Sequence, residues 1–242
     1  MSLDTSDFLQ RQLYASNDFE PAVREAITKR LRPGDVFVDI GANVGFYALC
    51  AAQIVGSKGK VFAFEPAPTT LRGLQKNISI NGAANTQPIQ IALSDSVGEA
   101  NLFMDAGYNS GATSLREAPN ASQAISVTLD TYDNYSERHG ITTPALIKID
   151  VEGAETLVVK GMSRLLALPN RPPMIIEISE FSLKQMGSSK DELFQIMRAN
   201  GYVPKLLTPA RVSMNSGEGA NLYFQYDVLF EPVSNATVDG PN

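Results

Sequence analysis

Short apolar runs alternate along this chain with segments in which apolar residues recur every three to four positions. The apolar runs, bounded by glycine, proline and other turn residues, predict buried strands, and the recurring apolar positions predict helices that bury one face. The strands predicted in this alternating part are 36–40, 61–64, 89–93, 145–149 and 174–178. The helices predicted before and between them are 20–31, 46–55, 69–80 and 154–168. This order predicts an α/β fold in which helices cover both faces of a mostly parallel sheet.

The end of the chain follows a different pattern. Ser189 and Glu192 form a capping box, which predicts the start of a helix that ends at Ala199. Residues 202–207 and 222–230 then read as two strands without a helix between them, so they are expected to pair antiparallel at the edge of the sheet. The prediction is therefore a seven-stranded, mostly parallel sheet whose last strand is antiparallel.

The 242-residue chain is expected to form one domain, because its length and its 43% hydrophobic content suit a single large core. Residues 101–104 and 125–129 read as strands around a loop rich in glycine, serine and asparagine, which predicts a small β insertion between the third and fourth strands. The expected boundaries are an N-terminal extension at 1–19, a core at 20–230, the insertion at 98–130 and a disordered tail at 231–242.

Composition narrows the possible partners and location. No run of about 18 apolar residues is present, so no membrane association is expected. The first ten residues lack the basic start and apolar run of a secretory signal, and Cys50 is the single cysteine; a cytoplasmic location is expected. The net charge of −6 and the lack of a basic run argue against nucleic acid as a partner. The oligomeric state is not indicated by the sequence.

The sharpest motif lies where the first predicted strand meets a helix. The segment Asp39-Ile-Gly41-Ala-Asn43-Val-Gly45 combines a tight turn with a helix start, and Phe46 opens the helix. Glycines at these points allow close approach of the backbone to a ligand and close packing of the helix on the strand. The backbone amides at the helix start then face the crevice beyond the strand ends, where a nucleotide-like ligand is expected to bind.

The ends of the next two strands extend this predicted cofactor site. Glu65, followed by Pro66, ends the second strand, where a carboxylate can accept hydrogen bonds from both hydroxyls of a ribose. Glu65 also fits an NAD site, but Asp39 favours the ammonium of a methionine moiety and would repel a pyrophosphate. Ser94 and Asp95 follow the third strand, where a carboxylate can accept from an adenine amino group or where the two residues simply form a turn.

Five ordered segments resemble the FkbM-type methyltransferases. They are VFVDIGANVGFYAL, FAFEPAP with Asn77 and Asn81 after it, IALSD, VTLD and LIKIDVEGAE. The resemblance runs from about residue 20 to residue 230. It implies a Rossmann-like class I methyltransferase fold that uses S-adenosylmethionine. Members of this family are associated with methylating hydroxyl groups on sugars and on natural products such as polyketides.

The catalytic candidates follow the later strands, because methyl transfer requires a base and an aligned nucleophile. Asp150 and Glu152 lie after the fourth strand, at the mouth of the crevice, and Asp150 is also expected to border the cofactor. Glu177 lies in the apolar fifth strand, where a buried carboxylate needs a partner or a role. His139, the single histidine, can act as a base near neutral pH, but its charged neighbours also suit an exposed loop.

The predicted acceptor site uses Glu180, after the fifth strand, and the polar loop residues Asn109, Ser110 and Thr113, although this loop also suits a plain surface connection. A carboxylate cluster can hold Mg²⁺, but no ligand spacing in the sequence specifies a metal, so no metal ligand is predicted.

The function predicted from these residues is transfer of a methyl group from S-adenosylmethionine to a hydroxyl of a small molecule, such as a sugar or a secondary metabolite. An amino-group acceptor is disfavoured, because the fourth strand lacks the Asn/Asp-Pro-Pro-aromatic segment that resembles many N-methyltransferases. Two alternatives stay open. An NAD-dependent oxidoreductase would share the glycine loop and Glu65, and a non-catalytic protein could keep the nucleotide pocket for a partner.

Overall fold

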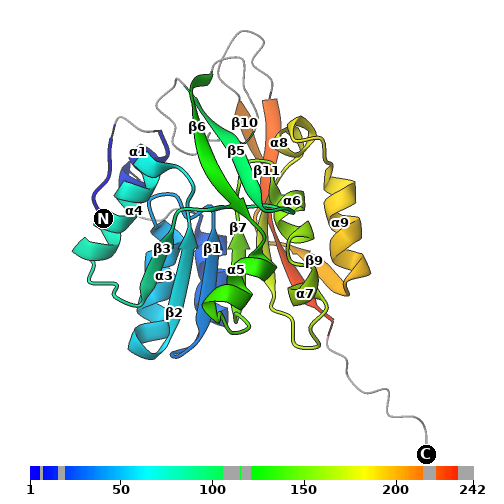
Figure 1. Cartoon of the computed structure of the whole chain (residues 1–242), viewed down its shortest axis with the longest axis horizontal. Coiled ribbons are helices and arrows are strands. Elements are labelled where there is room, and N and C mark those ends of the chain that lie inside the picture. The colour runs from blue at the N-terminus through cyan, green and yellow to red at the C-terminus, as the bar shows by residue number, and fades with distance from the viewer. Residues whose placement is uncertain (6–7, 16–19, 106–114, 116–120, 215–221, 234–242) are drawn as a thin grey trace, which may run out of the picture.

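The computed structural model describes residues 1–5, 8–15, 20–105, 115, 121–214 and 222–233. Its main feature is a twisted sheet with strand order β10-β11-β8-β7-β1-β2-β3, covered by helices on both faces (Figure 1). The parallel strands are β1 (Val36–Ile40), β2 (Lys60–Phe64), β3 (Thr86–Ile89), β7 (Leu146–Ile149) and β8 (Met174–Ser179). Because these strands are parallel, their carboxyl ends all meet at the same edge of the sheet.

The predicted antiparallel end of the sheet is confirmed. Strand β11 (Leu222–Pro232) pairs antiparallel with β8. Strands β9 (Tyr202–Leu206) and β10 (Arg211–Met214) pair antiparallel with different stretches of β11, so together they fill one position beside it. The sheet therefore has seven positions, as predicted, although eight strands form it in the described parts of the chain.

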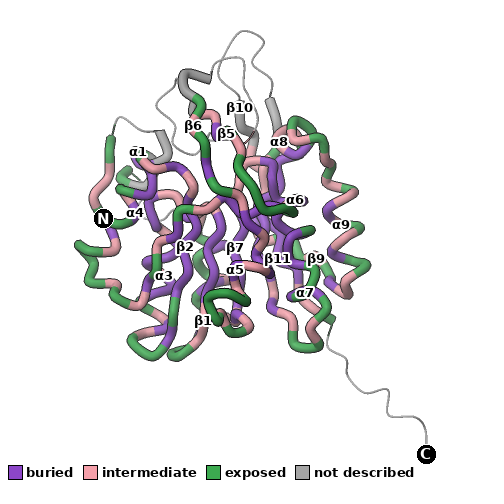
Figure 2. The backbone as a smooth tube through the Cα atoms, viewed as in Figure 1, coloured by how far each residue is buried: buried purple, intermediate pink, exposed green. Residues whose placement is uncertain are grey.

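The helices divide between the two faces of the sheet. On one face lie α2 (Pro21–Arg30), α3 (Phe46–Val55) and α4 (Pro68–Ile80), and their apolar residues share a core with β1 and β2. On the other face lie α5 (Tyr132–His139), α6 (Glu155–Lys160), α7 (Ser163–Leu166), α8 (Glu180–Gln185) and α9 (Lys190–Ala199). Helix α1 (Phe8–Ala15) and the short 3-10 helix η1 (Gly56–Lys58) complete the helices of the described chain. Buried residues concentrate in the central strands, and exposed residues lie on the outer helices (Figure 2).

The prediction of one strand at 89–93 is wrong. The main sheet ends at Ile89, and the chain then enters a second sheet through β4 (Ala92–Leu93). There β4 pairs parallel with β6 (Ala121–Asp130), which pairs antiparallel with β5 (Gly98–Asp105). Figure 1 shows β5 and β6 as a long green ribbon in front of the main sheet. One apolar run therefore contains residues of two sheets, which hydrophobicity alone cannot separate.

The prediction of one helix at 154–168 is also wrong, because the helix breaks at Gly161 into α6 and α7. A Cβ on Gly161 would lie 2.0 Å from the carbonyl oxygen of Ser94, so the chain passes the end of β4 too closely for any side chain. The buried Asp133 carboxylate then accepts hydrogen bonds from the backbone amides of Arg164 (2.6 Å) and Leu165 (3.1 Å), at the start of α7. These contacts hold the first turn of the second helix, α7.

Other predicted elements agree closely with the structure. The ranges 36–40 and 46–55 match β1 and α3, and the predicted helix start is confirmed because the Ser189 hydroxyl accepts from the Glu192 amide at 3.1 Å. The Glu192 carboxylate accepts from Lys160 and from the Ser188 hydroxyl, so the described structure shows only one of the two hydrogen bonds of a capping box. Helices α1, α5 and α8 and strand β10 were not predicted. Within the described chain, every helix is too short or too polar to cross a lipid bilayer.

Candidate functional site

The glycine loop after β1 lies against the loop that follows β7. The backbone at Gly41 has a φ of +83°, and a Cβ there would lie 1.7 Å from the carbonyl oxygen of Asp150. The amides of Gly41 and Ala42 both donate to the carbonyl of Phe64, at 3.0 and 2.9 Å, which ties the loop to the end of β2. Only glycine fits at position 41, so the loop brings the ends of three strands together.

The rest of the loop is fixed by α3 and α4. Gly45 has a φ of +94°, precedes α3, and leaves no room for a Cβ, which would lie 2.5 Å from the Leu74 side chain. Asn43 also has a positive φ, and its side-chain oxygen accepts from the Val44 amide at 2.7 Å. The buried Asn77 side chain donates to the Val44 carbonyl at 2.9 Å. Asn77, one of the residues quoted in the resemblance, thus holds the loop in place.

Glu65 lies at the end of β2 and faces this loop. Its two carboxylate oxygens accept from the amides of Asn43 (3.0 Å) and Ala67 (2.9 Å), and burial raises its pKa to about 7. Each carboxylate oxygen can accept more than one hydrogen bond. Glu65 is therefore able to receive two neighbouring hydroxyls, such as those of a ribose, while it keeps both contacts with the loop.

Asp39 is a buried carboxylate whose hydrogen-bonding capacity is largely unused. It is 1% exposed, and within the described structure neither oxygen has a partner at full hydrogen-bonding geometry, although the Ala48 amide is near enough to lower its pKa slightly. Burial raises its pKa to about 6, and this rise is limited by the charge of Lys148, the residue beside it on β7. A buried carboxylate without partners is costly, and a cationic ligand group would relieve that cost. Asp39 therefore fits the ammonium of a bound methionine moiety.

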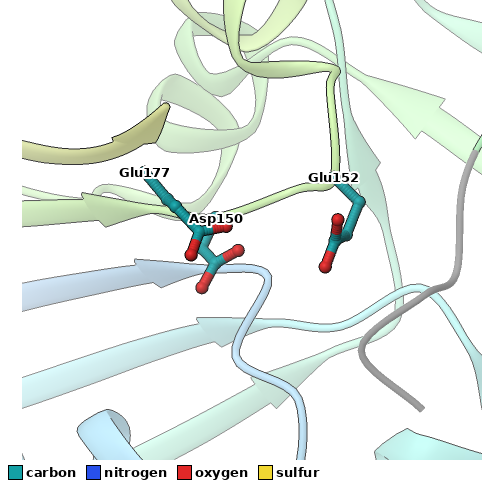
Figure 3. A group of neighbouring side chains, drawn as sticks. All are labelled: Asp150, Glu152 and Glu177. Carbon is teal, nitrogen blue, oxygen red and sulfur yellow. The ribbon is translucent and has the colours of Figure 1, made fainter. Parts of the chain in front are cut away.

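Three further carboxylates gather beyond Asp39. Asp150 and Glu177 lie side by side, and Glu152 approaches them from the loop that follows β7 (Figure 3). One oxygen from each of the three lies within 4.8 Å of the others, a spacing at which a divalent cation could also be held. The sequence predicted Asp150 and Glu152 at the crevice mouth and Glu177 in the fifth strand, but it did not specify that the three form one cluster.

The charges of the cluster divide its members into two kinds. Burial acts to raise the pKa of Asp150, but the ammonium of Lys148, 2.7 Å from the Asp150 carboxylate, outweighs it and lowers that pKa. Burial and the nearby Asp150 raise the pKa of Glu152 and of Glu177 well above the usual range. The cluster therefore combines one carboxyl group whose pKa is lowered with two whose pKa is raised, which is the arrangement expected for acid–base work.

A second set of contacts, which the sequence did not reveal, surrounds Glu177. Arg211 on β10 forms ion pairs with Glu177 (3.0 Å), with Asp227 of β11 (3.5 Å) and with Glu20. Glu20 precedes α2 with a φ of +43° and also accepts from the Tyr47 hydroxyl. Residues far apart in the sequence thus close one side of the site, and only the fold brings them together.

Glu155 positions the loop that carries two of the carboxylates. One of its oxygens accepts from the amides of Val151 (3.2 Å) and Gly153 (3.1 Å), on either side of Glu152. Glu152 itself has a φ of +53°, which is uncommon for a residue other than glycine. Burial raises the pKa of Glu155 to about 7. Glu155 therefore holds the loop that carries Asp150 and Glu152.

The remaining predicted residues lie in different surroundings. His139 is exposed at the end of α5, where its ring stacks on that of Tyr135 with 4.1 Å between the ring centroids. Because α5 leads into the amino end of β7, His139 lies at the opposite edge of the sheet from the carboxylates that follow β7. Glu180 begins α8 and pairs with Lys190 at 2.6 Å. Ser94 and Asp95, which were predicted to lie near adenine, follow β4 of the second sheet and not the third strand of the main sheet. Ser94 is buried and Asp95 is exposed.

Other predicted residues stay without a tested role. Phe46, at the start of α3, packs edge-on against the ring of Tyr47 at 5.0 Å, and Pro66 is half-buried beside Glu65. The predicted acceptor-loop residues lie outside the described parts of the chain; they are Asn109, Ser110 and Thr113.

Comparisons with known proteins identify the family of the chain. The model of the methyltransferase FkbM domain matches residues 39–204. The chain is 31% identical over 161 residues to hexuronic acid methyltransferase AglP of Haloferax volcanii, covering 66% of this chain and 62% of AglP. It is 28% identical over 185 residues to 31-O-demethyl-FK506 methyltransferase FkbM of Streptomyces tacrolimicus, covering 65% of this chain and 68% of that protein. The match therefore spans somewhat less than two thirds of AglP.

Solved structures share the fold at low sequence identity. The precorrin-6y C5,15-methyltransferase of Geobacter metallireducens superposes with a TM-score of 0.51 at 13% identity, covering 87% of both chains. An S-adenosylmethionine-dependent O-methyltransferase of Thermotoga maritima also gives a TM-score of 0.51 at 13% identity, covering 91% of this chain and 70% of that one. With the domain match across most of the sheet, these findings show that the chain belongs to the FkbM family of S-adenosylmethionine-dependent methyltransferases.

Proposed function

We propose that the protein methylates a hydroxyl group of a small molecule, such as a sugar or a natural product. The observation that carries this proposal is the Asp150 carboxylate at the crevice mouth, which lies 2.7 Å from the buried ammonium of Lys148 and beside the carboxyl groups of Glu152 and Glu177. The names of the two relatives, which describe a hexuronic acid and a demethylated natural product, support such acceptors. The net charge of −6 disfavours a nucleic-acid acceptor.

The cofactor is proposed to lie across the ends of β1 and β2. Glu65 would accept the two ribose hydroxyls and Asp39 the ammonium of the methionine part, and the backbone of the glycine loop, whose amides at 41–45 donate within the protein, would lie against the ligand. Ser94 or Asp95 would approach the adenine. This arrangement uses the carboxylate lone pairs that the protein itself leaves free.

Bound S-adenosylmethionine supplies a methyl group that moves by in-line displacement while the sulfur keeps the electron pair of the broken bond. The protein has to orient the acceptor hydroxyl and receive its proton. Asp150 is proposed to take that proton, because Lys148 holds it in the ionised form. Glu177 and Glu152 are proposed to bind other polar groups of the acceptor.

A transfer assay tests this proposal directly. The protein is incubated with S-adenosylmethionine carrying a ¹³C methyl group and with matched acceptors that differ only in a hydroxyl or an amino group, including a hexuronic acid glycoside. We expect a ¹³C-labelled methyl ether and at least a hundredfold lower turnover for Asp150→Asn. Labelled methylamine from the amino acceptors, with no ether from the hydroxyl acceptors, would contradict the proposed acceptor class.

Asp39 gives a prediction about pH. Its folded-state pKa of about 6 lies above the value of 3.8 expected when it is exposed, so the folded protein favours the protonated carboxyl. The stability it contributes is present below about pH 3.8 and is lost as the pH rises through about 6. Asp39→Asn should therefore make the cofactor-free protein more stable at pH 8, by on the order of 2 kcal/mol, and should weaken S-adenosylmethionine binding at least tenfold.

Urea unfolding at pH 5 and pH 8, with and without the Asp39→Asn substitution, checks this expectation. Glu65 and Glu155 also have raised pKa values, of about 7, so part of the pH dependence should persist in the variant. An unchanged difference in unfolding free energy between the two pH values would show that Asp39 does not carry this cost.

A further inference from the structure

Lys148 is a cationic side chain in an unusual place. It lies in the middle of the central strand β7 and is 1% exposed, and it is the one cationic side chain that is fully buried in the described part of the chain. Lysine is almost never buried in this way unless it is paired. Its position therefore calls for a specific explanation.

The ammonium of Lys148 lies between the two halves of the proposed site. It is 2.7 Å from the Asp150 carboxylate, on the side where the acceptor is proposed to bind. In the parallel pairing of β1 and β7, Lys148 is the direct partner of Asp39, on the side where the cofactor is proposed to bind. The ring of Tyr47 covers the ammonium at 4.8 Å from the ring centroid. Lys148 thus has a carboxylate toward each half of the site and an aromatic face above it.

The carboxylates around the site divide between two cations. Arg211 forms ion pairs with Glu20, Glu177 and Asp227. Lys148 is the cation that offsets the negative charges of Asp39 and Asp150. The carboxyl group of Glu152 lies close to that of Asp150. Without Lys148, these carboxylates would face one another at short range in a buried environment, which is strongly unfavourable.

We propose that Lys148 is a positioning residue that acts as the built-in cation of the carboxylate cluster, in the place that a divalent metal ion would otherwise take. It fixes the direction of the Asp150 carboxylate through the 2.7 Å contact and balances Asp39 at the same time. The inference deepens the proposed function, since it explains how Asp150 is held ready to receive a proton. It predicts that the cluster of Asp150, Glu152 and Glu177 does not need a metal.

Titration of the full chain with Mn²⁺, followed by electron paramagnetic resonance of the free ion, tests this inference without an acceptor or a cofactor. The wild type should show no stoichiometric Mn²⁺ site. Lys148→Met removes the cation and leaves three carboxylate oxygens within 4.8 Å of one another, so it should bind one Mn²⁺ at least tenfold more tightly than the wild type. Lys148→Arg keeps the charge and should bind no more Mn²⁺ than the wild type.

Lys160→Met is the matched control. It removes the same charge from an exposed pair in which Lys160 lies 2.8 Å from Glu192, so it should create no Mn²⁺ site. Adding Mn²⁺ should also raise the midpoint of thermal unfolding of Lys148→Met, and not that of Lys160→Met.

Two results would overturn the inference. One is a stoichiometric Mn²⁺ site in the wild type that disappears in Glu177→Gln, because the cluster would then hold a metal beside Lys148. The other is a folded Lys148→Met protein that gains no affinity for Mn²⁺. If Lys148→Met and Lys148→Gln both fail to fold, the wild-type titration alone decides: no site supports the inference, and a site overturns it. None of these readouts depends on methyl transfer, so a failed transfer assay is distinguishable from a failure here.

Discussion

Gly41→Ala is expected to abolish cofactor binding and to destabilise the protein by about 3 kcal/mol or more. The new methyl group would lie 1.7 Å from the carbonyl oxygen of Asp150, which is backbone and cannot rotate away. The positive φ of +83° adds strain for any residue with a Cβ. Relief of the clash requires the loops after β1 and β7 to move apart. The first loop follows Asp39, and the second carries Asp150 and Glu152.

Gly34→Ala separates the two causes. Gly34 has a φ of +94°, but no atom lies within 4 Å of the position that a Cβ would take. This control should lose only about 1 kcal/mol, from backbone strain, and should bind S-adenosylmethionine normally. Urea unfolding and calorimetric titration of both variants provide the comparison. Equal effects of the two substitutions would show that the close approach of Gly41 to Asp150 is not important.

Glu65→Ala is expected to weaken S-adenosylmethionine binding at least a hundredfold. The substitution removes the acceptor of the Asn43 and Ala67 amides, and it also removes the proposed acceptor of the ribose hydroxyls. Hydrogen bonds to a charged group contribute about 1.5–3 kcal/mol each, so the loss of two accounts for a hundredfold change. Glu65→Gln, which keeps one side-chain oxygen, should give an intermediate affinity.

Glu180→Ala is the matched control for Glu65. Glu180 also follows a parallel strand of the sheet, but it pairs with Lys190 in an exposed position. Its substitution should leave the affinity for S-adenosylmethionine within about twofold, because exposed ion pairs contribute little. Calorimetric dissociation constants for the two variants check this pair of expectations. A normal affinity in Glu65→Ala would remove Glu65 from the cofactor site.

The sequence predicts the main sheet well because its signals are local. Strand β1 and helix α3 have the predicted bounds, since a buried apolar run, the glycine loop and the next turn mark their ends clearly. The errors occur where distant contacts decide the structure. Ala92 and Leu93 belong to the second sheet because they pair with β6, and the helix after Asp150 breaks at Gly161 because Ser94 passes close by.

The site shows the same division. Asp39, Glu65 and Asp150 could be predicted because each stands at the end of a recognisable strand. Arg211 and Glu20 could not, because 191 residues separate them in the sequence and neither belongs to a motif. Lys148 had a usable signal, since a charged residue inside the apolar run Leu146–Ile149 must be buried and therefore needs partners.

The most direct test of the cofactor site is calorimetric titration of the wild-type protein with S-adenosylmethionine, with its demethylated product and with NAD, in parallel experiments. The geometry of Asp39 and Glu65 predicts one binding site per chain for the first two ligands and no binding of NAD, whose pyrophosphate Asp39 would repel. Binding of NAD at the same site, or no binding of S-adenosylmethionine, would contradict the roles assigned to these two carboxylates.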